Sequence, residues 1–280
     1  MWQPWQTPVK IEIRDSSGEL IATRYGPSQY GVNRFIWDMH YDKPTAIDFE
    51  SSPLEGKPPA FEELSGPEAL PGTYSISVTV GGHTETATAR VLADPNQSTG
   101  LAGQRRALQL ALEARAQADA MNRMLNHVSA MQSQLDAYRK SVATAANGID
   151  PADRAQAKAQ APLLERGKAL GKELGTLKDS VYDPNVQHKV GEDSLHQLTD
   201  LHDALEANAS SLASLGLQAP TAPLLAIEAE LTGKLDAKLA AYNALLTGDV
   251  AAYDQAAYAA GAPTLAAGQP IKVAAPPDIH

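Results

Sequence analysis

The stretch that decides the fold reads Gly-Val-Asn-Arg-Phe-Ile-Trp-Asp-Met-His-Tyr and runs from Gly31 to Tyr41. A second stretch, Leu-Pro-Gly-Thr-Tyr-Ser-Ile-Ser-Val at residues 70–78, is the other strand-like segment of the same predicted core. In an extended chain Phe35 and Trp37 share one face, and the second stretch alternates apolar with hydroxyl side chains. We therefore expect both stretches to be inner strands of a small β-sandwich, with the Trp37 indole buried and its N–H bonded to a partner.

The flanking sequence predicts further short strands. Val9, Ile11 and Ile13 alternate with charged residues, and the turn residues 15–18 lead into a partner strand at 20–23. Gly81-Gly82 is a two-residue hairpin signal after the strand that contains Tyr74. Residues 1–94 are thus predicted to form a β-sandwich, which the resemblance described below makes immunoglobulin-like, interrupted by a proline-rich insertion at 42–69.

From Leu101 onward the period of the apolar residues becomes that of a helix. We expect four long amphipathic helices, the first ending at Asn147-Gly148 and the fourth at Gly248, with a kink or a fresh start at Pro162 and a short further helix at 249–260. Glycines at every fourth position (Gly167, Gly171, Gly175) predict a flat face for close helix approach. The predicted fold class is α+β and multidomain: a sandwich, an antiparallel four-helix bundle at 95–261, and a loose tail at 262–280.

Composition narrows the classes of partner. The chain has 280 residues and a formal charge of -10, which repels phosphate backbones and anionic lipid. We expect no nucleic-acid partner and no membrane insertion, because no apolar run approaches the ~20 residues of a spanning helix. There is no cysteine, which excludes disulfides and thiolate chemistry, and the first residues do not read as a signal peptide.

Two groups of residues are candidates for chemistry. Glu192, His196 and Asp200 share one helical face, and imidazole with carboxylates suits zinc, although this spacing also occurs on ordinary solvated faces. In the insertion, Phe61, Glu62 and Glu63 could contact a sugar, or they could simply be solvated. Asp38 is expected to cap backbone rather than act as an acid, since no second carboxylate is placed to pair with it. We predict no catalytic residue and no cofactor.

The β part resembles the immunoglobulin-like domain of the flagellar hook-capping protein and of many bacterial exported proteins. Three patterns carry the resemblance: Val-x-Ile-x-Ile-x-Asp-x-x-Gly at 9–18, Gly-x-Asn-x-x-x-Trp-Asp at 31–38, and Pro-Gly-x-Tyr at 71–74. The motif residues are Gly31, Trp37, Asp38, Pro71, Gly72 and Tyr74. The whole chain, linked by Ala-Asp-Pro-Asn at 93–96, looks like the C-terminal region of large bacterial proteins with sortilin-like or BNR-repeat β-propellers, often labelled glycosyl hydrolases.

The resemblance implies a non-catalytic accessory module. The propeller that would carry hydrolase chemistry precedes such a region, and this chain does not contain it. Its partner would be a β-propeller domain or another protein, in the periplasm or outside the cell, whereas the chain by itself would be cytoplasmic. The alternatives are the carbohydrate-binding part of a glycoside hydrolase and a metal-binding helical bundle.

Overall fold

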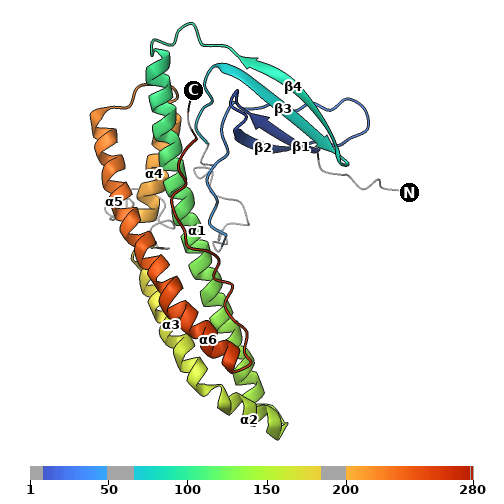
Figure 1. Cartoon of the computed structure of the whole chain (residues 1–280), viewed down its shortest axis with the longest axis vertical. Coiled ribbons are helices and arrows are strands. Elements are labelled where there is room, and N and C mark those ends of the chain that lie inside the picture. The colour runs from blue at the N-terminus through green and yellow to red at the C-terminus, as the bar shows by residue number, and fades with distance from the viewer. Residues whose placement is uncertain (1–8, 49–65, 184–199, 278, 280) are drawn as a thin grey trace, which may run out of the picture.

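The computed structural model describes residues 9–48, 66–183, 200–277 and 279. In these residues the protein is an α+β fold, with a small antiparallel sheet set at one end of a long helical region (Figure 1). None of the described helices is both long and apolar enough to cross a membrane.

Four strands form the sheet. They are β1 (Val9–Arg14), β2 (Leu20–Gly26), β3 (Gly72–Val80) and β4 (His83–Val91), in the order β2-β1-β3-β4. The turn between β1 and β2 is built as predicted, because the Asp15 carboxylate accepts the backbone N–H of Ser17 and of Glu19. The hairpin between β3 and β4 is also confirmed, since Gly81 and Gly82 both have positive φ.

The stretch at 31–38 differs from its prediction. It contains no strand in the structure, and the described residues supply one sheet without a second layer, so a β-sandwich is not confirmed. Asn33 explains the difference, because its side chain bonds the backbone of Gln29 and Gly31 and folds the chain into a turn. Trp37 is half-buried and packs on the sheet edge-on, instead of joining it.

The helical region begins with a helix of 46 residues, α1 (Leu101–Ala146). It continues through α2 (Pro151–Ala159), α3 (Ala161–Asp179), α4 (Leu201–Ser214), α5 (Ala222–Leu245), the π-helical turn η2 (Leu246–Val250) and α6 (Ala251–Ala259). The break expected near Pro162 lies at Gln160, between α2 and α3. The short helix expected at 249–260 is confirmed as α6, but no break at Gly248 separates it from α5, because the chain passes from α5 through η2 into α6.

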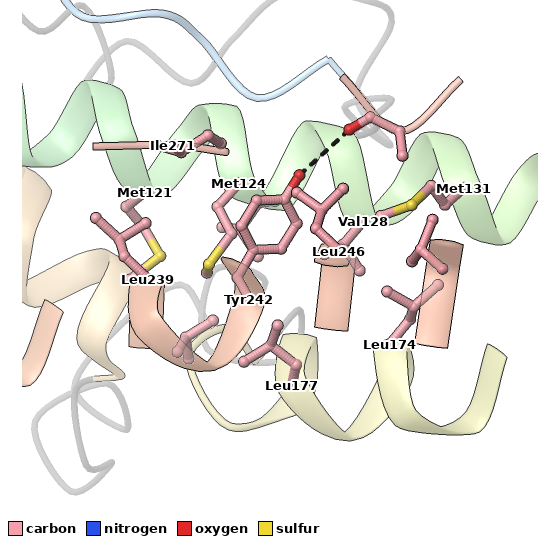
Figure 2. Close-up of a cluster of buried hydrophobic side chains, with 14 of the residues drawn as sticks. Met121, Met124, Val128, Met131, Leu174, Leu177, Leu239, Tyr242, Leu246 and Ile271 are labelled. Carbon is pink, nitrogen blue, oxygen red and sulfur yellow. Dashed lines mark hydrogen bonds between the residues drawn. The ribbon is translucent and has the colours of Figure 1, made fainter. Parts of the chain in front are cut away.

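The helices do not lie as four equal rods. α3 and α4 follow one another along α1, and the backbone N–H of His202 in α4 donates to the carbonyl of Val181 just after α3 at 3.0 Å. α5 returns alongside them and α6 reaches α3 (Figure 1). Tyr242 lies in the middle of the resulting core, among Met121, Met124 and Leu239 (Figure 2).

The three glycines of α3 form the flat face for close helix approach that their spacing predicts. Gly167 and Gly171 face Leu135 of α1, and a Cβ on Gly167 would lie 3.3 Å from the Leu135 side chain. Gly175 faces Gln132 in the same way. The absence of side chains on this face of α3 therefore allows α1 to approach closely.

The tail predicted to be loose is packed against the helices. Residues 262–277, here called the C-terminal strap, have no regular structure, yet Ile271 is 1% exposed and Ala267 is buried in the helical core. Asn243 of α5 donates to the carbonyl of Ile271 and accepts its N–H, at 2.8 and 2.9 Å. The strap runs back along the helices toward the sheet (Figure 1). Its prolines prevent regular structure, but the buried side chains of Ala267 and Ile271 and the hydrogen bonds to Asn243 hold it in place.

The sheet and the helical region share a core across the predicted boundary at residue 94. Leu108 and Leu112 of α1 are buried in one cluster with Ile11, Ile13 and Tyr74 of the strands. Ile279, after the strap, also packs on this cluster. The N-terminal part of α1 is therefore the surface on which the sheet rests.

Candidate functional site

The last two residues of β2 and the loop that follows them span residues 25–39 and are here called the apolar loop. Asn33 organises its first half: its Oδ1 accepts the N–H of Gln29 at 3.0 Å, and its amide donates to the carbonyl of Gln29 at 2.8 Å. Gly31 takes a φ of 101° with open space around its Cα, which suits the turn. The Gly-x-Asn part of the motif is thus a local turn device.

Trp37 anchors the second half of the apolar loop. Its ring meets Tyr74 edge-on at 5.1 Å between centroids, and its indole N–H donates to the carbonyl of His40 at 3.2 Å. The predicted partner for this N–H is therefore confirmed. Tyr74 is itself fixed, because its hydroxyl donates to the carbonyl of Leu70, next to Pro71 and Gly72, at 2.5 Å.

An ion-pair network completes the frame of the loop. Arg24 of β2 bonds the Asp42 carboxylate and lies 3.5 Å from Asp38. Asp38 also accepts the backbone N–H of His40 at 3.2 Å, which confirms its expected capping role. Two strand-like motifs far apart in sequence, at 31–38 and 71–74, are brought together here, although only the second is a strand.

This frame presents apolar side chains to solvent. Tyr30 and Val32 are 109% and 103% exposed, and Tyr25 and Ile36 are 68% and 78% exposed. The sequence interpretation missed this surface, because apolar alternation at 31–37 was read as burial in a strand. The signal that could have revealed it is Asn33 two residues after Gly31, a pair that favours a local turn over extension.

A buried polar cluster lies where α4 begins, with ligand-type atoms of Asp200, His202 and Asp203 within 4.8 Å of one another. Asp200 is the only one of the three predicted metal ligands in the described residues; Glu192 and His196 lie outside them. Both oxygens of Asp200 already accept backbone N–H groups, from Asp203 at 2.8 Å and from Asp183 at 2.7 Å. Asp200 is therefore the N-cap of α4.

His202 is held between two carboxylates. Its Nδ1 lies 3.1 Å from Asp203 Oδ1, and its Nε2 lies 3.3 Å from Glu206 Oε1, although the latter contact is not aligned as a hydrogen bond. Burial opposes the charged form, but the hydrogen bonds and charges of Asp203 and Glu206 outweigh it and raise the pKa of His202 to about 9. A metal ligand has to be the neutral imidazole, so this arrangement favours an imidazolium over a bound metal ion.

Glu206 connects the cluster to α1. The amide of Asn122 donates to Glu206 at 2.9 Å and to the backbone carbonyl of Thr45 at 2.8 Å. The pKa of Glu206 is lowered, because the contacts with His202 and Asn122 outweigh the burial that raises it. The cluster therefore joins α1, α4 and the segment after the apolar loop.

The remaining candidate residues cannot be placed. Phe61, Glu62 and Glu63, the possible sugar-contacting residues, lie outside the described residues. Comparison of the chain with protein-family models, curated proteins and solved structures gave no match. The resemblance to the C-terminal region of propeller proteins therefore stays a prediction.

Proposed function

We propose that this chain is a non-catalytic interaction module of an exported protein and that it docks through the apolar loop. The observation that carries the proposal is the full exposure of Tyr30 and Val32 on a loop whose backbone is held in place. In this proposal the sheet and loop are the immunoglobulin-like domain that the motifs imply, and the helical bundle is its spacer. The partner is the β-propeller of the resemblance.

Energetics support docking through this loop. Burying a Tyr or Val side chain stabilises a complex by about 1.5–3 kcal/mol, and tyrosine is enriched among the residues that dominate interfaces. The loop also loses little conformational entropy on binding, because Asn33, Trp37 and Arg24 already hold it. An exposed apolar group of this kind is typical of a binding surface.

A photo-crosslinker tests the proposal in the cells that make the protein. Tyr30 is replaced by a benzophenone amino acid, and the matched control places the same residue at Tyr258, which is 82% exposed on α6. We expect light to attach a β-propeller protein at position 30 and not at position 258. Equal crosslinking at both positions, or no propeller at position 30, contradicts the proposal.

A loss-of-binding variant refines this test. Tyr30→Ser with Val32→Ser removes the apolar groups and keeps Asn33, so the loop keeps its shape. We expect binding to the crosslinked propeller to weaken at least tenfold, because two buried side chains are lost. Circular dichroism checks that the double variant is folded.

A further inference from the structure

β4 is an edge strand whose outer side is open. The two-residue turn makes Val80 and His83 a hydrogen-bonded pair, so alternate residues of β4 turn their N–H and C=O groups away from β3. These outward residues are Thr84, Thr86, Thr88 and Arg90. No described residue forms a hydrogen bond with these outward backbone groups. β4 lies at the border of the sheet, on the side away from the helices (Figure 1).

The opposite edge of the same sheet is closed. Along β2, the Asp42 carboxylate accepts the outward N–H of Thr23 at 3.0 Å, and the N–H of Asp42 donates to the carbonyl of Ile21 at 3.0 Å. The pairing of β1 with β2 also contains an irregularity at Ile13/Arg14. Proteins protect exposed edges in this way, so the contrast singles out β4.

β4 has the features of a strand that can accept another strand. It is nine residues long, it pairs with β3 without a register shift, and it contains no proline. Its Thr84 and Thr86 hydroxyls bond Thr79 and Ser77 of β3, at 2.8 and 2.9 Å, which ties the edge strand to its neighbour. Such an edge is a template for β-strand addition.

Charge argues that the added strand is another copy of the chain. The whole chain carries a charge of -10, which opposes self-association over most of its surface. The sheet is different. Its strands carry Lys10, Arg14, Arg24 and Arg90 against Glu12 and Glu85, and Asp15 and Glu19 in the turn between β1 and β2 bring the basic and acidic residues into balance. Two copies can therefore meet at the sheet without net repulsion.

We propose that β4 pairs with β4 of a second copy, antiparallel and across a two-fold axis at Ala87. In this register Thr86 faces Thr88 of the other copy and Thr84 faces Arg90, so every outward backbone group of the strand finds a partner. Glu85 faces Ala89, and no two like charges are opposite one another. The pairing joins the two sheets into one continuous sheet and leaves the apolar loop free.

The first test measures self-association. Sedimentation equilibrium from about 1 µM to about 500 µM covers a weak dimer, which is what a contact along one strand edge produces. Thr86→Pro removes an outward N–H and places a ring in the edge, while the backbone bonds to β3 are kept and only the hydroxyl contact with Ser77 is lost. Thr86→Val keeps the N–H and is the control.

We expect the native chain and Thr86→Val to dimerise and Thr86→Pro to dimerise at least tenfold more weakly, with an unchanged circular dichroism spectrum. A chain that stays monomeric over the whole range overturns the proposal. A dimer that Thr86→Pro does not weaken also overturns it, because the contact then lies elsewhere.

The second test does not depend on the proline variant. The chain has no cysteine, so Ala87→Cys introduces a single thiol at the proposed axis. Residues opposite one another in a non-hydrogen-bonded pair have Cα atoms ~4.5 Å apart, a separation that a disulfide can bridge. We expect mild oxidation to link Ala87→Cys much faster than Ala240→Cys, an exposed control position on α5; equal rates refute the register.

Discussion

At the scale of single residues, His202 shows how a buried charge can be part of the framework. Its side chain is 1% exposed, yet Asp203 and Glu206 on the same helix provide opposite charge on both sides of the ring. Removing one partner of such a group leaves a buried charge without compensation, which is strongly destabilising. The cluster therefore favours a structural role for His202.

This role predicts a pH dependence of stability. The pKa of His202 is raised to about 9 in the folded chain, so its contribution is complete below the ordinary histidine pKa of about 6.5 and is lost as the pH rises through about 9. We expect the free energy of unfolding in urea to fall by on the order of 2–3 kcal/mol between these pH values. His202→Gln should remove most of this slope. A native chain with the same stability at both pH values would contradict the assignment.

At the scale of elements, local chemistry explains which predictions succeeded. The strands of the hairpins were predictable from period-two alternation and glycine turns. The end of α1 was predictable from Asn147-Gly148, and the start of α3 from Pro162. The stretch at 31–38 was not predictable, since the side-chain bonds of Asn33 overrode the apolar alternation. The strap was missed because Asn243, which binds it, is distant in sequence and gives no local signal. For the candidate site, the Trp37 and Asp38 partners were foreseen, but the exposure of Tyr30 was not.

The strap yields a prediction for Asn243. Asn243→Ala removes the two hydrogen bonds to Ile271 and should lower the free energy of unfolding by about 1–3 kcal/mol. Amide hydrogen exchange should accelerate at 265–273, while the amides of α3 keep their protection. Asn147→Ala is the control, because that exposed amide donates only to the end of its own helix. Unchanged exchange at 265–273 would show that the strap is held by its apolar side chains alone.

At the scale of the whole molecule, the sheet and the helices are tied together at several places. Leu108 and Leu112 belong to the core of the sheet while their helix forms the bundle. The strap, and the segment 42–48 that follows the apolar loop, both run along the helical region. The predicted division at residue 94 is therefore crossed by packing and by hydrogen bonds.

This architecture predicts one cooperative unfolding transition. Trp37, whose ring packs on Tyr74 of β3, reports on the β part, whereas far-ultraviolet circular dichroism reports mainly on the helices. We expect the two probes to give the same denaturation midpoint. Leu112→Ala should shift both equally, with a loss of about 2–5 kcal/mol, since the side chain is 1% exposed. Two separate midpoints would mean that the sheet and the helices unfold as independent units.

The way α1 holds the segment 42–48 has a consequence for how freely that segment can vary. Arg115, Asp119, Asn122 and Asn126 lie on one face of the helix and contact mainly the backbone of the segment, at Asp42, Thr45, Ala46 and Asp48. Hydrogen bonds to main-chain atoms do not depend on the identity of the side chain at an exposed position. The exposed positions Lys43 and Ala46 can therefore accept other residues, whereas Asp42, Pro44 and Ile47 are fixed by their side chains, because Asp42 binds Arg24, Pro44 is buried and Ile47 packs on the helical core.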